Sequence, residues 1–198
     1  MNLGKPPCIR MQQKHGRLIM ILNLLRRKSR VNEAITLSAY EKIVAAARQK
    51  RFYADFLVPD TPIGRYEMLS LHVFLLMHRL KSEKPALKAL TQDIAEEFFK
   101  DVDHSLRELG IGDQGVPKRM KKLARMYYGR VLSYAEAIDK NDEAELALAL
   151  SRNVRPDLAE AGQIWEQSGA MAAYTLQTHE FLRRQPDSNF LEASFSFS

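Results

Sequence analysis

Hydrophobic residues recur at helical spacing from about residue 35 onward, and no segment shows sustained alternation of apolar and polar residues. Residues 65–81 are apolar on nearly every side, which predicts a buried central helix. Within it, His72 and His78 are expected to be hydrogen-bonded packing residues, because six positions apart they point to different sides. The pattern predicts an all-α fold, a single compact multi-helix domain.

The expected helix boundaries follow from capping residues, prolines and glycines. Ser38 and Glu41 form a capping-box pattern, which predicts that a helix begins there. Pro85 suits the first turn of a helix that runs to Leu109, before the glycine-rich residues 110–115. The remaining predicted helices begin at Pro117, after Asp142, near Pro156 and at Ala170, and the one from Pro156 is expected to include Ile164 and Trp165.

The two ends of the chain differ from the middle, which is expected to form a helical domain over residues 31–186. Residues 1–30 hold eight Lys and Arg and no Asp or Glu, within a formal net charge of +6 for all 198 residues. An apolar run at 18–25 is flanked by cations, namely Arg17, Arg26, Arg27 and Lys28. This basic N-terminal arm is typical of a targeting segment or of a helix on an anionic membrane. The alternative is a first helix packed on the body. Residues 187–198 are expected to form a flexible tail.

The sequence offers few means of catalysis or metal binding. Cys8 is the only cysteine, so the chain has no internal disulfide and no multi-cysteine metal centre. We find no nucleophile elbow, no phosphate-binding loop and no HExxH motif. Residues 110–115 spell GxGxxG, but they follow a predicted helix rather than a strand and are interpreted as a turn. We therefore expect no enzymatic activity, no cofactor and no metal.

One acidic stripe keeps a metal hypothesis open. Asp93, Glu97, Asp101 and His104 lie at steps of four, four and three on one side of the predicted helix 85–109. An acid-x-x-His pair occurs in carboxylate-bridged di-metal bundles, but such bundles need a second pair, and we find none. The solvated face of a helix is therefore the preferred interpretation, with a helical di-metal carboxylate protein as the alternative.

A second basic feature lies in the helix predicted from Pro117. Its cations cluster on the side opposite Met120, Leu123 and Tyr127. They are Lys118, Arg119, Lys121, Lys122 and Arg125. Such a face favours the phosphates of RNA or of anionic lipid, so a general RNA-binding or membrane-surface module is one hypothesis. The alternative is an ordinary outer face that pairs with the acidic stripe. Without zinc-finger spacing or a helix-turn-helix, we expect no DNA partner.

Three stretches, residues 48–72, 98–113 and 116–130, resemble the ubiquinol–cytochrome c chaperone family. The resemblance covers roughly residues 35–185. The positions that match the family motif are Asp103, Arg107, Gly110, Gly112, Asp113, Pro117, Lys118, Arg119, Lys122, Gly129 and Arg130. Some of these have expected structural roles. Gly110 and Gly112 allow a turn, Pro117 opens a helix, and Asp113 is expected to cap it.

The resemblance implies a non-enzymatic assembly chaperone for ubiquinol–cytochrome c reductase, or respiratory complex III. It implies that the protein holds newly made cytochrome b, or another complex III subunit, near the membrane. Further partners implied are a small partner chaperone, the ribosome and an anionic membrane surface. The expected location is the cytoplasm, peripheral to the inner membrane of a bacterium, or the mitochondrial matrix in a eukaryote.

Overall fold

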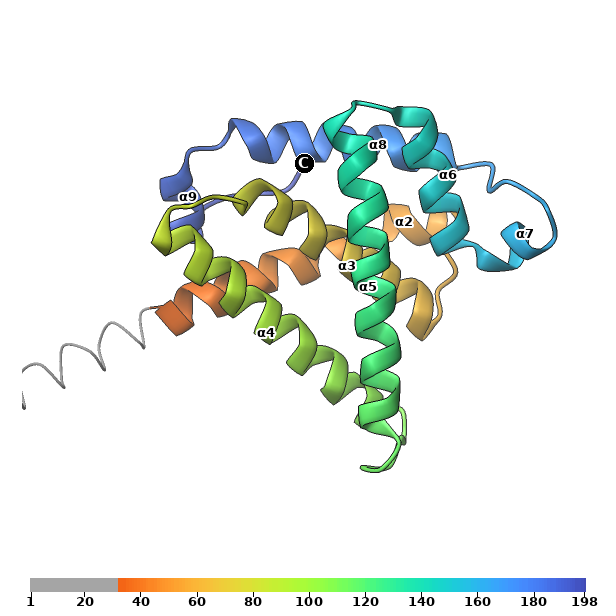
Figure 1. The fold of residues 1–198 in the computed structure, drawn as a ribbon, viewed down its shortest axis with the longest axis horizontal. Coiled ribbons are helices and arrows are strands. Elements are labelled where there is room, and N and C mark those ends of the chain that lie inside the picture. Colours follow the sequence, from red (N-terminus) through yellow and green to blue (C-terminus); the bar gives the residue numbers. More distant parts are fainter. Residues whose placement is uncertain (1–31) are drawn as a thin grey trace, which may run out of the picture.

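A computed structural model describes residues 32–198, and throughout this range the regular secondary structure is helical (Figure 1). The all-α prediction is confirmed. The expected basic arm, with Arg17, Arg26, Arg27 and Lys28, lies outside the described residues. The helices are, in chain order, residues 32–47, α2 (Lys50–Ala54), α3 (Pro62–Leu80), α4 (Pro85–Glu108), α5 (Val116–Asp139), α6 (Glu143–Val154), α7 (Pro156–Glu160), α8 (Ser168–Arg184) and α9 (Asp187–Leu191).

The helix α3 forms the centre of the molecule. Its residues Met68, Leu71, Leu75 and Leu76 are fully buried, and α4, α5, α6 and α8 all contact it. A helix that is apolar around most of its circumference is stable only when other helices cover it. Figure 1 shows the two long helices α4 and α5 converging at the loop between them, at the end of the molecule furthest from α6 and α8.

The histidines of α3 act as packing residues, as predicted. His72 is fully buried and its Nδ1 lies 2.7 Å from the carbonyl oxygen of Met68, while its Nε2 lies 2.7 Å from the hydroxyl oxygen of Tyr174 on α8. Because a backbone carbonyl can only accept, Nδ1 carries the proton and Nε2 accepts from the tyrosine. Burial lowers the pKa of His72 to about 4, so the ring is neutral. His78 lies 3.3 Å from a carboxylate oxygen of Asp139.

The C-terminal residues are an ordered part of the fold, and the expected flexible tail at 187–198 is wrong. Phe190 and Phe195 are buried, and their rings stack with centroids 5.1 Å apart. Asp187 in the first turn of α9 accepts from Arg79 at 2.9 Å and from Lys84 at 2.6 Å. Two buried aromatic rings outweigh the entropy of ordering the small polar residues around them.

Two further helix predictions are wrong in detail. The chain is already helical at residue 32, so Ser38 lies inside the helix and does not cap it. The predicted helix carrying Trp165 stops much earlier, at Glu160, because Gly162 adopts a left-handed conformation with φ +69°. Trp165 is nevertheless buried, and its backbone N–H donates to Ser151 Oγ at 2.9 Å.

Candidate functional site

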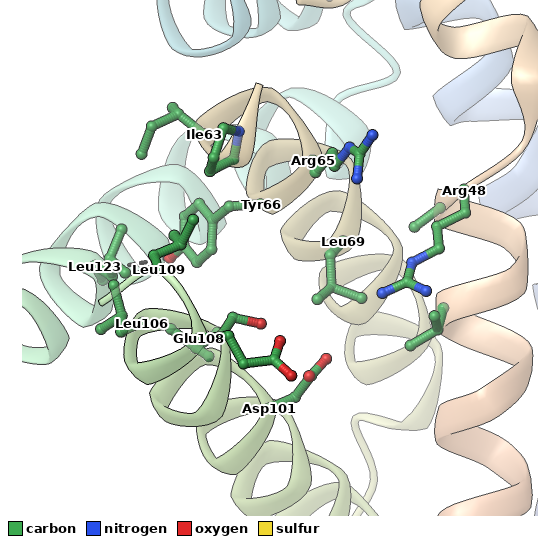
Figure 2. Close-up of a pocket in the computed structure, with 15 residues that line it drawn as sticks. Arg48, Ile63, Arg65, Tyr66, Leu69, Asp101, Leu106, Glu108, Leu109 and Leu123 are labelled. Atoms are coloured by element: carbon green, nitrogen blue, oxygen red, sulfur yellow. Dashed lines mark hydrogen bonds between the residues drawn. The ribbon is translucent and has the colours of Figure 1, made fainter. Parts of the chain in front are cut away.

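An apolar groove of about 340 Å³ opens on the surface between the helix 32–47, the start of α3, the end of α4 and the first half of α5 (Figure 2). Its wall is mainly aliphatic and aromatic, formed by Val44, Ala47, Ile63, Tyr66, Leu69, Val102, Leu106, Leu109 and Leu123. Ile63 and Leu109 are 49% and 57% exposed, so each leaves about half of a large apolar side chain in contact with water. Four elements distant in sequence therefore build one concave apolar surface.

Two tyrosine hydroxyls join the walls of this groove. Tyr40 donates to Asp101 Oδ2 at 2.8 Å, linking the helix 32–47 to α4, and Tyr66 donates to the carbonyl oxygen of Leu123 at 2.8 Å, linking α3 to α5. Burial and the carboxylate of Asp101 raise the pKa of Tyr40, and burial raises the pKa of Tyr66 to about 12. Both hydroxyls stay protonated at physiological pH, so they remain donors that fix the shape of the groove.

The start of α3 comes close to the preceding loop because residue 64 is glycine. A Cβ atom on Gly64 would lie 1.9 Å from the carbonyl oxygen of Pro59. The backbone N–H of Gly64 also donates to Thr61 Oγ1 at 3.1 Å, which caps the helix. This close approach holds Ile63 at the mouth of the groove.

Charged side chains surround the apolar wall. Figure 2 shows Arg48 on one side of the groove and Asp101 and Glu108, both from α4, on the other. Arg65 at the α3 end donates to Asp60 at 2.6 Å. An apolar floor with a charged rim suits an amphipathic segment, which buries its apolar side and leaves its polar side wet.

The acidic stripe has ordinary structural partners. Asp101 accepts from Tyr40, Glu97 lies 3.4 Å from Lys100, and His104 lies 3.1 Å from Glu108. Within residues 32–198, no three His, Cys, Asp or Glu side chains gather in a way that could hold a metal ion. The di-metal alternative, which needs Asp93, Glu97, Asp101 and His104 as a cluster, has no support in this part of the chain.

The family-motif residues between α4 and α5 form a compact turn. Gly110 ends α4 with φ +79°, and Arg107 bridges Asp103, at 2.7 Å, and Asp113. Pro117 lies in the first turn of α5, as predicted. The expectation that Asp113 caps α5 is wrong, since Gly115 occupies the cap position and Asp113 instead pairs with Arg107. Gly112 lies in this turn without a left-handed φ.

Arg130 belongs to the core. Its Nη2 lies 2.6 Å from Glu67 Oε1, and the two side chains are only 9% and 2% exposed. Burial raises the pKa of the Glu67 carboxyl, and the positive charge of Arg130 opposes that shift. Arg130 is therefore a structural link between α5 and α3.

The cations at the start of α5 are exposed, as their spacing predicts. Lys118, Arg119, Lys121, Lys122 and Arg125 all point to solvent. Among the described residues no carboxylate lies within salt-bridge distance of any of them, so they do not pair with the acidic stripe. Their role as a binding face stays a prediction.

The apolar groove was not predicted from the sequence. Ile63 and Leu109 were not distinguished from core residues, because a single sequence carries the same apolar pattern for both. The one local signal is their position, since Ile63 follows Pro62, which begins a helix, and Leu109 precedes Gly110, which ends one.

The fold and the groove define an all-helical protein with a surface suited to apolar groups. Residues 54–197 match the family model described as ubiquinol-cytochrome C chaperone, and the chain belongs to this family. The predicted resemblance is confirmed. A crystal structure of the Cbp3 homolog from Brucella abortus is similar to this chain, with a TM-score of 0.82 and 63% identity over 90% of this chain and 96% of that one.

More distant relatives carry the name ubiquinol-cytochrome c reductase complex assembly factor 1. The Xenopus laevis protein is 28% identical over 103 residues, which are 52% of this chain and 51% of that protein. The Homo sapiens protein is 28% identical over 116 residues, which are 59% of this chain and 38% of that protein. The matched region thus spans about half of these relatives or less.

Proposed function

We propose that this protein is an assembly chaperone for ubiquinol–cytochrome c reductase, which holds newly made cytochrome b and performs no chemistry of its own. The observation that carries the proposal is an apolar groove, with Ile63 and Leu109 half exposed at its mouth, in a member of the ubiquinol–cytochrome c chaperone family. Newly made cytochrome b presents apolar segments that need cover before they are assembled, and the groove offers that cover.

The size of the groove fits a reversible contact. Complete burial of a Leu or Ile side chain is worth roughly 1.5–3 kcal/mol, and Ile63 and Leu109 are already about half buried. Together they contribute on the order of 2–3 kcal/mol when a bound segment covers them. Such an interaction is weak enough for release, as an assembly factor requires, and further contacts must supply the rest of the affinity.

Charge supplies a means of staying near the membrane. In our proposal the basic arm, with Arg17, Arg26, Arg27 and Lys28, binds anionic lipid, since each cation near such a surface adds about 1 kcal/mol. None of the helices within residues 32–198 has the length and apolar character that a bilayer crossing demands. The proposed location is the cytoplasmic side of a bacterial inner membrane, supported by the similarity to a bacterial homolog. Contacts with the ribosome and a small partner chaperone are part of the same proposal.

Deletion of the gene tests this function. We expect the amount of assembled complex III, measured from its b-type haem spectrum and by native gels, to fall while total protein synthesis is unchanged. A plasmid copy should restore it. Normal complex III in a clean deletion strain would contradict the proposal.

A further inference from the structure

The outer face of α5 carries a continuous exposed stripe on the side away from the groove. Leu123 lines the groove and Leu132 is 74% exposed. Nine positions separate them, which places them on opposite sides of a helix of about 3.6 residues per turn. The same periodicity puts the other exposed residues of the stripe beside Leu132, within an arc of about 120°. They are Lys118, Lys121, Lys122, Arg125, Tyr128 and Gly129. Beyond Leu132 the same arc continues into Glu136 and Asp139, whose carboxylates already lie within salt-bridge distance of Lys140 and His78.

Gly129 lies within this stripe and has no structural reason to be glycine. It is inside a 24-residue helix, on a side of that helix that is exposed to solvent. A Cβ atom there would meet nothing within 4 Å. A glycine at such a position lowers helix stability by roughly 1 kcal/mol relative to alanine. Its only evident physical effect is a bare patch of backbone, and bare backbone allows a second helix to approach closely.

The residues around Gly129 indicate which kind of helix approaches α5 at this position. On the N-terminal side lie Lys121, Lys122 and Arg125, which have no carboxylate partner within residues 32–198. Leu132, which is 74% exposed, lies on the C-terminal side, and Tyr128, which is 59% exposed, directly precedes Gly129. We infer that this stripe is a docking surface for an acidic helix of a partner protein. In this arrangement the partner helix crosses α5 at Gly129. The carboxylates of the partner helix lie against the cations of α5, and its apolar residues lie against Tyr128 and Leu132.

A membrane or an RNA fits this stripe less well. A helix that lies on a membrane has a broad apolar face with cations at its flanks, whereas here Lys118 and Arg125 lie along the centre of the stripe. RNA phosphates are satisfied by cations alone and leave a bare glycine and an exposed leucine unexplained. A helix with acidic and apolar residues accounts for the cations, the bare glycine and the exposed leucine together.

Photo-crosslinking in cells tests the surface with the full-length protein. A photoreactive phenylalanine replaces Leu132, and the crosslinked segment is identified by mass spectrometry after irradiation. We expect one segment of one partner protein, with Asp or Glu at helical spacing beside the crosslinked residue. The variant Gly129→Leu should reduce this crosslink about tenfold, because the added side chain separates the two backbones.

Gly169→Leu is the matched control, since Gly169 is also an exposed glycine in a helix with nothing within 4 Å of an added Cβ. It should leave the crosslink unchanged. Neither variant should lower the melting temperature, so a lost crosslink cannot be ascribed to unfolding. If Gly129→Leu does unfold, Lys121→Glu with Arg125→Glu serves instead, and reversing the partner's acidic residues to lysine should restore the crosslink.

The inference is overturned by crosslinks to lipid, to RNA or to a second copy of this chain, by no crosslink above the unirradiated background, or by one that Gly129→Leu leaves intact. The readout does not involve complex III or the groove. The docking surface and the proposed function can therefore fail separately.

Discussion

Arg130 on α5 and Glu67 on α3 form an ion pair inside the core, with Nη2 and Oε1 2.6 Å apart. The pair lies at the point where the long α5 helix crosses the central helix. A plain count of charges assigns Arg130 to the basic segment that precedes it. Helical periodicity places it near Tyr127, on the buried side, and the structure agrees.

Removing one member of this pair should be far more damaging than removing both. Arg130→Met removes the positive charge that opposes the effect of burial, so the Glu67 carboxyl takes up a proton in the folded protein at pH 7.5, and we expect the free energy of unfolding to fall by about 3–5 kcal/mol. The double variant Arg130→Met with Glu67→Gln should recover about half of that loss or more, because glutamine is neutral without taking up a proton. Urea unfolding at pH 7.5 measures both. A loss below about 1 kcal/mol in Arg130→Met would show that the pair is unimportant.

Stability should decrease in mild acid because of His72. Burial lowers its pKa from the ordinary 6.5 to about 4 in the folded protein. The unfolded chain therefore binds a proton at a pH where the folded protein does not. The contribution of the neutral His72 ring to the free energy of unfolding is fully present above pH 6.5. It is lost as the pH falls from 6.5 to 4, by roughly 3 kcal/mol in total. Urea unfolding at several pH values measures how steeply the free energy of unfolding falls with pH.

His72→Gln is the control for this pH dependence. It removes the titrating group while keeping a side chain that can form hydrogen bonds. Between pH 6.5 and 4, the stability of this variant should fall less steeply than that of the natural protein. Equal slopes would show that His72 does not contribute.

The C-terminal residues should be required for stability. Phe195→Ala removes a fully buried ring that stacks on Phe190, and we expect a loss of about 3–5 kcal/mol in the free energy of unfolding. Phe181→Ala is the matched comparison, because Phe181 is exposed, and it should change stability by less than about 1 kcal/mol. Similar small effects in both variants would mean that the last residues do not pack.

The turn between α4 and α5 should depend on Gly110 but not on Gly112. Gly110 has φ +79°, which an L-residue with a side chain adopts at a cost of roughly 1–2 kcal/mol, so Gly110→Ala should destabilise the protein by that amount. Gly112 has no left-handed φ and no neighbour within 4 Å of an added Cβ. Gly112→Ala should therefore be within about 0.5 kcal/mol of the natural protein. Thermal unfolding compares the two, and equal effects would contradict this difference.

Local signals made most of the helices predictable. Pro85 and Pro117 lie in the first turns of α4 and α5, and Gly110 ends α4, because these residues restrict the backbone whatever surrounds them. The helix start predicted at Ser38 is wrong, because a capping-box pattern inside a longer helix looks the same as one at the start of a helix. Helix ends set by tertiary contacts do not appear in local sequence.

The groove depends on how the helices pack. Val44, Ile63, Leu109 and Leu123 come from four different elements, and only their packing shows that they surround one hollow. The same reason explains the error at the C-terminus, where the buried rings of Phe190 and Phe195 lie beneath Arg79 and Lys42, which are far away in the sequence. The basic stripe of α5 could be predicted because a single helix determines it.

The central claim is that the groove binds an apolar segment during complex III assembly, and a pair of isoleucines tests it most directly. Ile63 and Ile164 are 49% and 66% exposed, but only Ile63 lies at the groove. The measurement is the amount of complex III in deletion cells that carry Ile63→Glu or Ile164→Glu at equal protein levels. We predict that Ile164→Glu restores complex III and that Ile63→Glu does not. Equal restoration by both variants would contradict the account.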